Sequence, residues 1–93
     1  MEHMYSFNEV LAEAIKRYGK DKQKDMAIEE CAELINALQK EKRHRVTDED
    51  VITEVADVFI MCCQLAMMYG LDKVDEEIGR KINQLQERLG INS

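Results

Sequence analysis

Proline and tryptophan are absent from this 93-residue chain, glycine occurs only four times, and aromatic side chains make up 5% of the residues. Folds built from many short strands need frequent turns that contain glycine or proline, and their strands are enriched in aromatic residues. The chain has little of either, while 34% of its residues are charged and 45% are hydrophobic. This composition predicts an all-α protein.

Basic residues are also fewer than acidic residues. Lysine and arginine number 13 against 19 aspartates and glutamates, so the formal net charge is −6 and the pI is near 4.9. The acidic residues are spread through the chain and do not form a tail, which is typical of charges on helices. Because nucleic-acid phosphates select a basic surface, we expect no nucleic-acid partner.

The three cysteines form no C-x-x-C motif, and an odd number makes no disulfide framework. Cys62 and Cys63 are adjacent, and we expect both to behave as small core side chains. The opening residues lack the charged and apolar regions of a signal peptide. The apolar stretch 55–68 is shorter than the roughly 20 residues that span a bilayer. These absences predict a cytoplasmic protein with no membrane partner.

The length predicts one helical domain, residues 1–93. Four segments carry apolar residues at helical spacing, with start and stop signals at their ends. The predicted helices begin at Ser6 or Asn8, Asp25, Thr47 and Asp72, and the first, third and fourth end at Gly19, Gly70 and Gly90. Residues 19–25 are predicted to form a polar connection. Four helices with short connections are typical of a bundle, and a chain this small often gains stability by forming at least a homodimer.

The most apolar segment is Asp50–Tyr69, whose hydrophobic residues cover nearly the whole circumference of a helix. Such a helix is normally buried on all sides. Glu54 and Asp57 nevertheless lie in its first half, three residues apart, which places both carboxylates on one face. Ionised carboxylates are rarely buried unless they pair with a cation or bind a metal. These two side chains therefore need a partner.

A second acidic group, EECAE, lies on the preceding helix. Glu30 and Glu33 fall at the border of the apolar face of that helix, and Glu29 lies further round. Solvated acids would prefer the far side, where Asn36 and Lys40 are predicted to lie. Both helices therefore carry acids beside apolar residues, where solvated acids are not expected.

If the two helices are neighbours, Glu30, Glu33, Glu54 and Asp57 form an all-oxygen pocket of negative charge. Acids that face acids repel unless a cation lies between them, and oxygen ligands suit Mg²⁺ or Mn²⁺. Two other interpretations stay open. The glutamates of the second helix could pair with lysine or arginine, or the bundle could hold a di-iron site, which would want a Glu-x-x-His motif that neither histidine supplies.

A carboxylate pocket without Cys, His or a nucleophilic Ser points to metal-assisted hydrolysis of a phosphoanhydride. Mg²⁺ usually joins a few carboxylates to substrate phosphates and lowers the pKa of an attacking water. Glu29 or one of the ligands is the candidate base for this water. The basic segment 40–46 is either a solvated loop that complements the negative end of the second helix or a place where Arg43 or Arg45 holds a polyphosphate tail.

These residues resemble a known family. Glu29-Glu30-x-x-Glu33 followed by Glu54-x-x-Asp57, within AIEECAELINAL and VITEVADVFIMCCQLA, is similar to the signature of the MazG-like all-α nucleoside triphosphate pyrophosphohydrolases. The resemblance covers roughly residues 25–90. It implies a helical homodimer or homotetramer that uses Mg²⁺, with Mn²⁺ as a substitute, to cleave a (deoxy)nucleoside triphosphate into a monophosphate and pyrophosphate.

The resemblance also implies roles for single residues. The metal ligands would be Glu30, Glu33, Glu54 and Asp57, and the catalytic residues Glu29, Glu33 and Glu54. The family often carries a phosphate-contacting basic residue in its last helix, then a polar or basic residue, then an arginine. Lys81 and Arg88 match the outer two positions as substrate phosphate contacts, and Leu85 departs from the pattern between them. Without this role, Lys81 and Arg88 would be solvated charges on an amphipathic helix.

Two other functions are compatible with the same residues. Phosphoribosyl-ATP pyrophosphohydrolase belongs to the same superfamily and has a similar Glu-rich signature, although VFIMCCQLAMMYG is more similar to the MazG-like branch. The other alternative is a non-catalytic helical dimer that acts as a regulatory or interaction module and has a degenerate metal site.

Overall fold

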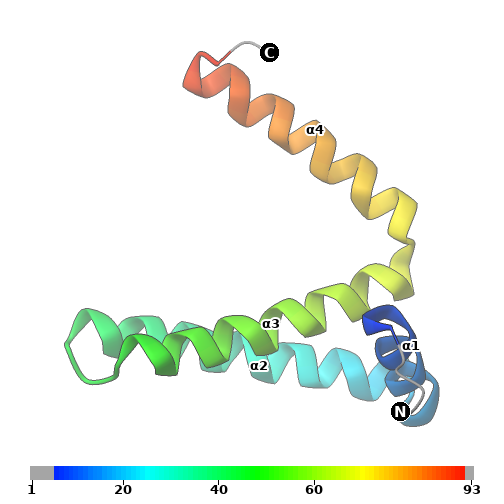
Figure 1. The fold of residues 1–93 in the computed structure, drawn as a ribbon, viewed down its shortest axis with the longest axis horizontal. Helices are drawn as coiled ribbons and strands as arrows, with labels where there is room; N and C mark the ends of the chain where they lie inside the picture. The colour runs from blue at the N-terminus through cyan, green and yellow to red at the C-terminus, as the bar shows by residue number, and fades with distance from the viewer. Residues whose placement is uncertain (1–5, 92–93) are drawn as a thin grey trace.

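A computed structural model describes residues 6–91, and these residues form four α-helices and no strand. The helices are α1 (Phe7–Tyr18), α2 (Lys20–Lys42), α3 (Asp48–Tyr69) and α4 (Leu71–Leu89) (Figure 1). The all-α prediction is therefore confirmed for the described part of the chain.

Local signals set the starts of α1 and α3. Ser6 and Glu9 form a reciprocal capping box, in which Glu9 N donates to Ser6 Oγ at 3.1 Å and Ser6 N donates to Glu9 Oε1 at 2.8 Å. Thr47 and Asp50 form the same arrangement at the start of α3. Each box satisfies two backbone donors that the first turn of a helix leaves without a partner. The predicted starts at Ser6 and Thr47 are confirmed.

Two predicted starts were wrong. The second helix begins at Lys20, not at Asp25, so the predicted polar connection forms its first turns. Gly19 has a φ of 90°, and this single residue turns the chain from α1 into α2. The fourth helix begins at Leu71 after Gly70, with no side-chain cap. Asp72 lies in its first turn, where a carboxylate still stabilises the positive end of the helix.

Helices α2 and α3 form an antiparallel hairpin, and α1 packs across the end of this hairpin that is remote from the α2–α3 loop (Figure 1). Helix α4 contacts only α3 among the described helices. It diverges from the hairpin after the turn at Gly70, so the outline in Figure 1 is open on one side. The hairpin is therefore the part of the chain that can position a site between two helices.

The hydrophobic core of the single chain is small. Four apolar side chains are buried among the described residues, namely Leu11, Ala27, Ala37 and Met61. Two glutamines, Gln23 and Gln64, are buried with them. Within one chain α3 is not buried on all sides, because Phe59 is 62% exposed. The prediction that Cys62 is a core side chain is wrong for one chain, because Cys62 is exposed, while Cys63 is half-buried.

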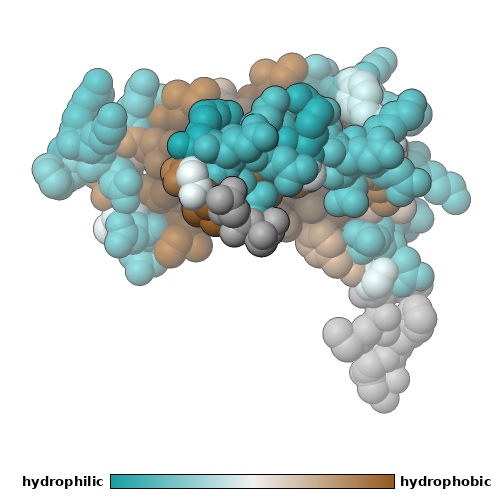
Figure 2. Space-filling view, turned by 90° about the horizontal axis from the view of Figure 1, so that it is seen from above, coloured by the Kyte–Doolittle hydropathy of each residue, from teal (hydrophilic) through white to brown (hydrophobic). Residues whose placement is uncertain are grey.

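Large hydrophobic side chains remain on the surface of every helix, and Figure 2 shows brown hydrophobic patches between the hydrophilic groups. On α3 and α4 they include Ile52, Val55, Phe59, Ile78, Ile82, Leu85 and Leu89. Within one chain, the most apolar helix therefore keeps much of its hydrophobic surface exposed.

Helix α3 is also long and apolar enough to cross a membrane by length and composition alone. The core helix of a soluble protein can have the same length and composition. The half of α3 that follows the α2–α3 loop carries Glu54 and Asp57, whose charges would be costly in lipid.

Candidate metal centre

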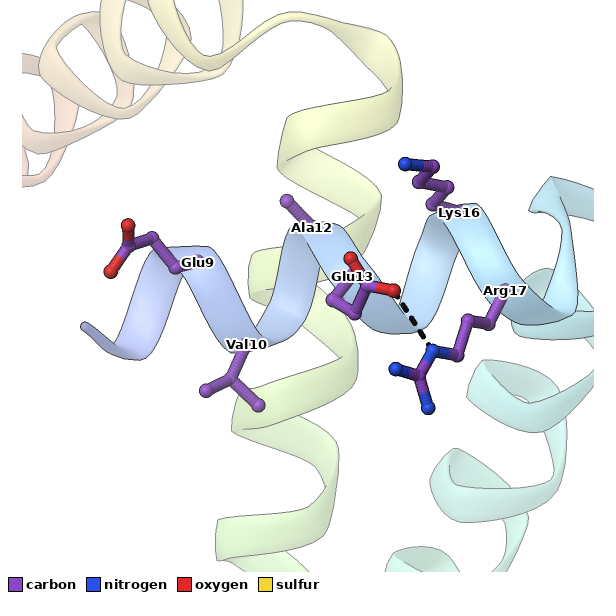
Figure 3. Close-up of a pocket in the computed structure, with 6 residues that line it drawn as sticks. All are labelled: Glu9, Val10, Ala12, Glu13, Lys16 and Arg17. Atoms are coloured by element: carbon purple, nitrogen blue, oxygen red, sulfur yellow. Dashed lines mark hydrogen bonds and ion pairs between the residues drawn. The ribbon is translucent and has the colours of Figure 1, made fainter. Parts of the chain in front are cut away.

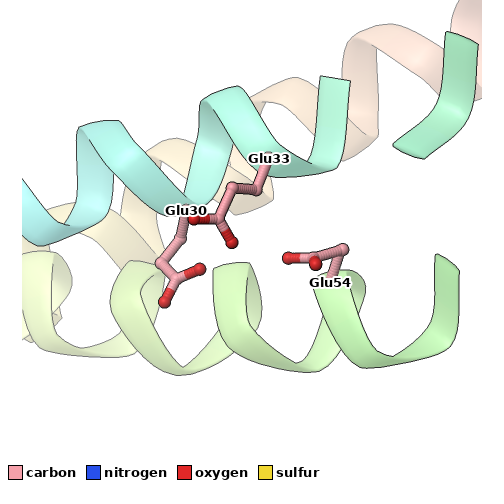
Figure 4. Close-up of side chains that lie close together, drawn as sticks. All are labelled: Glu30, Glu33 and Glu54. Atoms are coloured by element: carbon pink, nitrogen blue, oxygen red, sulfur yellow. The ribbon is translucent and has the colours of Figure 1, made fainter. Parts of the chain in front are cut away.

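Three carboxylates meet between α2 and α3. Glu30 and Glu33 extend from α2 and Glu54 from α3, and one oxygen of each lies within 4.8 Å of the others (Figure 4). Glu30 and Glu54 are half-buried, whereas Glu33 is exposed. The structure thus brings together three of the four residues that the sequence predicted as ligands.

The spacing of the acids explains why they converge. Glu30 and Glu33 are three residues apart on α2, and Glu54 and Asp57 are three apart on α3. Residues three apart lie one above the other on a helix surface. Because the helices run antiparallel, Glu33 lies level with Glu54 and Glu30 with Asp57. Asp57 is half-buried, and although it is not one of the three clustered residues, its charge raises the pKa of both Glu30 and Glu54.

The cluster is electrostatically unfavourable without a cation. Burial raises the pKa of Glu30, and the negative charges of Asp57, Glu33 and Glu54 raise it further. Burial also raises the pKa of Glu54, with further contributions from Glu33, Asp57 and Asp50. Both effects favour the neutral acid, because a carboxylate loses hydration on burial and like charges repel.

Two oxygens in the cluster have no protein partner. Glu30 Oε1 and Glu54 Oε1 are buried and accept no hydrogen bond. The ion pairs among residues 6–91 are Glu13–Arg17, Glu77–Arg80 and Glu77–Lys81. None of them involves the clustered acids, so pairing with lysine or arginine does not account for these residues in the described chain. Buried carboxylate oxygens without donors match the ligand preference of a hard divalent cation. The donor set therefore fits Mg²⁺ or Mn²⁺.

An open groove of about 380 Å³ adjoins the cluster. It runs between α2 and the start of α3 and is lined by Glu33, Asn36, Ala37, Lys40, Val46, Asp50, Thr53 and Glu54. Since Glu33 and Glu54 belong to both features, a ligand in the groove would reach the acids directly. Lys40 is the basic side chain of this lining.

The sequence interpretation missed the groove. It placed Asn36 and Lys40 on the far side of the second helix, away from the acids. In the structure both line the groove beside Glu33. Asn36 and Lys40 follow Glu33 by three and seven residues, which is the spacing of one helical face. That spacing was the signal that could have placed them with the acids.

A larger hollow of about 610 Å³ lies along α1 (Figure 3). Its lining comes from this one helix and comprises Glu9, Val10, Ala12, Glu13, Lys16 and Arg17. Arg17 Nε donates to Glu13 Oε2 at 2.8 Å, which satisfies the acid in the middle of the hollow. Because the lining contains no cluster of like charges and no orphaned polar atom, we assign it no chemistry.

The remaining predicted residues lie outside the cluster. Glu29 is exposed on α2. Lys81 lies on α4, where its Nζ is 3.8 Å from Glu77 Oε2, and Arg88 lies in the last turn of the same helix. Helix α4 makes no contact with α2, so one chain does not bring these cations to the acids. Arg43 and Arg45 are exposed and do not line the groove.

Comparisons of the chain with models of protein families, with curated proteins and with solved structures found no match. The family that the acidic signature resembles stays a prediction.

Proposed function

We propose that this protein is a Mg²⁺-dependent nucleoside triphosphate pyrophosphohydrolase of the MazG-like kind, which converts a (deoxy)nucleoside triphosphate into a monophosphate and pyrophosphate. One observation carries the proposal: Glu30 and Glu54 each bury a carboxylate oxygen without a hydrogen-bond donor, inside a cluster of like charges. Such a cluster is stable when ionised only if a cation neutralises it.

Four side chains of this chain would hold the metal. Glu30, Glu33 and Glu54 supply the clustered oxygens, and Asp57 lies close enough to influence two of them. A bound Mg²⁺ would neutralise phosphate oxygens and lower the pKa of an attacking water. Glu33 is the exposed member of the cluster and borders the groove, so it is the best placed to accept a proton from that water. Glu29 is exposed nearby and is the second candidate base.

The groove supports a nucleotide substrate. Its volume of about 380 Å³ falls within the range of roughly 300–1,000 Å³ that is usual for ligand pockets. Asn36 and Thr53 offer hydrogen-bonding groups to a sugar or base, and Lys40 offers a positive charge. With the triphosphate at the acids, the nucleoside would extend along α2 toward Val46.

We further propose that the chain acts as a homodimer or homotetramer in the cytoplasm. The exposed apolar residues of α3 and α4 support this proposal, because a second copy could cover them. A second copy could also supply Lys81 and Arg88 as phosphate contacts, which α4 does not bring to the acids within one chain.

The test is pyrophosphate release from a panel of dCTP, dUTP, ATP and phosphoribosyl-ATP, with Mg²⁺ and with EDTA. The wild-type chain is compared with Glu54→Gln, which keeps the shape of the side chain and removes its charge, and with Glu76→Gln, which removes an exposed charge on α4. We expect Mg²⁺-dependent release that Glu54→Gln abolishes and Glu76→Gln leaves unchanged. Turnover of phosphoribosyl-ATP alone would assign the chain to that branch of the superfamily.

The exposed apolar faces favour a second candidate function, a helical interaction module without catalysis. In that case the chain would still form an oligomer, but it would release no pyrophosphate and would bind Mn²⁺ no more tightly than Glu54→Gln does.

A further inference from the structure

A buried pair of glutamines joins α2 to α3 away from the acids. Gln23 and Gln64 are 3% and 4% exposed, and they are the buried polar residues of the described chain. Gln23 Nε2 donates to Gln64 Oε1 at 2.8 Å, across 41 positions of sequence. Ala27 and Met61, four and three residues from the glutamines along α2 and α3, are also buried, and Met61 Sδ lies 3.9 Å from Gln64 Nε2.

Stability alone does not explain this pair. Gln23 Oε1 is buried without a partner, and Gln64 Nε2 meets only the weak acceptor Met61 Sδ, at 3.9 Å. A buried polar atom without a good partner costs about 1–3 kcal/mol, whereas two apolar groups of the same shape would be neutral or stabilising. A buried polar pair that is costly in this way is best known for fixing the register of packed helices.

The sequence positions of the pair match those of the acids. Gln23 precedes Glu30 by seven residues, and Gln64 follows Asp57 by seven. Gln23 precedes Glu33 by ten residues, and Gln64 follows Glu54 by ten. On antiparallel helices, equal steps from a bonded pair arrive at residues that lie level with each other. The hydrogen bond that sets Gln23 opposite Gln64 therefore sets Glu30 opposite Asp57 and Glu33 opposite Glu54.

The acids lie between the α2–α3 loop and the glutamine pair. The loop joins the two helices covalently at one end of the hairpin, and the Thr47–Asp50 capping box fixes the start of α3 there. Repulsion among the carboxylates pushes α2 and α3 apart in the middle. Beyond the acids, Ala27 and Met61 are buried apolar side chains, and apolar packing does not by itself fix how far one helix slides along the other. The hydrogen bond between the glutamines is directional and can fix this position.

We propose that Gln23 and Gln64 are positioning residues, whose hydrogen bond holds α2 and α3 in the register at which the four acids can share one divalent cation. This inference rests on the proposed metal site. Metal sites need their ligands held closely, and partners hydrogen-bonded to the ligands change metal affinity by about 10- to 100-fold when they are replaced. Because the glutamines lie seven residues from the nearest of the four acids along each helix, we expect an effect at the lower end of that range.

The test replaces both glutamines with methionine, which matches glutamine in length, in the full chain. We measure Mn²⁺ affinity by titration calorimetry and the thermal midpoint in EDTA. Gln39→Met is the matched control, because Gln39 is an exposed glutamine of α2. We expect the double variant to keep or raise its midpoint and to bind Mn²⁺ about tenfold more weakly, while the control binds as the wild type does. If the pair served stability alone, the double variant would have a lower thermal midpoint than the wild type and would bind Mn²⁺ as tightly as the wild type does.

The Mn²⁺ titrations distinguish the proposed metal site from the positioning role of the glutamines. If the wild type binds Mn²⁺ and the double variant binds it equally well, the positioning role is overturned and the metal site stands. If the wild type binds no Mn²⁺, both the metal site and the positioning role are overturned. If the methionine pair does not fold, the Gln23→Leu/Gln64→Leu pair replaces it in the same measurements.

Discussion

The carboxylate of Glu33 on α2 faces that of Glu54 on α3, and its charge raises the pKa of Glu54 across the interface between the helices. No lysine or arginine among residues 6–91 forms an ion pair with either side chain. The hairpin therefore holds its like charges at a cost to its own stability. A cation that binds between the helices removes this cost, and the predictions below follow from that relationship.

The first prediction concerns pH. Burial and neighbouring charges raise the pKa of Glu30 and Glu54 in the folded chain. A raised carboxyl pKa destabilises the folded state most at pH values above the raised pKa; this penalty shrinks as the pH falls through the raised pKa and is gone below the ordinary value of 4.5. In EDTA, thermal unfolding should therefore move to higher temperature as the pH is lowered from 8 toward 5.

Two other carboxyls, those of Asp50 and Glu77, affect the stability of the fold at lower pH. Hydrogen bonds lower the pKa of Asp50 and of Glu77, so the stability that they contribute is lost only as the pH falls below their ordinary values of 3.8 and 4.5. Glu54→Gln should flatten the rise between pH 8 and 5 and leave the loss at lower pH in place. A wild-type midpoint that falls steadily from pH 8 to 5 would contradict the proposed repulsion.

The second prediction is that Glu30→Gln melts at a higher temperature than the wild type without metal and at a lower temperature than the wild type with metal. Without metal, removal of this charge relieves repulsion from Asp57, Glu33 and Glu54, so the variant should melt at a higher temperature than the wild type. With excess Mn²⁺ the order should reverse, because the variant has lost a ligand. Differential scanning calorimetry in EDTA and in Mn²⁺ measures both midpoints. A variant that melts below the wild type in both buffers would indicate a structural role for Glu30.

The third prediction is stabilisation by metal. A ligand that binds only the folded state stabilises it by about 2.7 kcal/mol at a concentration 100 times its Kd. Mg²⁺ and Mn²⁺ should therefore raise the thermal midpoint, and EDTA should return it to its starting value. The increment should fall at acidic pH, because ligands must lose their protons before they bind metal. Asp57→Asn should reduce the increment, whereas Asp72→Asn on α4 should not change it. An equal increment in both variants would remove Asp57 from the ligand set.

The fourth prediction concerns the helix start that borders the groove. Thr47 Oγ1 accepts from Asp50 N, and Asp50 Oδ2 accepts from Thr47 N. Loss of such a cap costs about 1 kcal/mol, or roughly 4–8 °C in a domain of this size, so Thr47→Ala should lower the midpoint by that amount. Thr53→Ala is the control, because its hydroxyl bonds only to the Glu49 carbonyl within α3. Equal midpoints for the two variants would show that the box contributes little.

Local signals made part of this fold predictable from sequence. The Thr47–Asp50 box and the stop at Gly70 depend on residues within one turn, and α3 begins and ends there. The convergence of Glu30, Glu33 and Glu54 was predictable because spacing of three residues puts two acids on one face of a helix, and the sequence interpretation set the two acidic faces against each other. The Mg²⁺ chemistry stays a prediction until it is measured.

Other features depend on packing that no local pattern reports. Lys20–Asp25 was predicted as a connection because it is polar, but Gln23 is buried against Gln64, which lies 41 positions away. Burial of Gln23 places these first turns of α2 within the folded hairpin. The path of α4 was not predictable either, because α4 contacts only α3 among the described helices and its large apolar side chains stay exposed in one chain.

The fifth prediction tests what covers that face. Ile82 is 50% exposed on α4 and shares one side of the helix with other exposed apolar residues. A charge placed there would have to be buried if a second copy covers the face, and burial of an unpaired charge is strongly unfavourable. Ile82→Glu should therefore convert the proposed oligomer to monomer in light scattering coupled to gel filtration. Gln84→Glu adds the same charge at another exposed position of α4 and should leave the oligomer intact. If Ile82→Glu stays oligomeric at the same protein concentration, the interface lies elsewhere, and the outer face of α3 becomes the next surface to test, because Ile52, Val55 and Phe59 are exposed there.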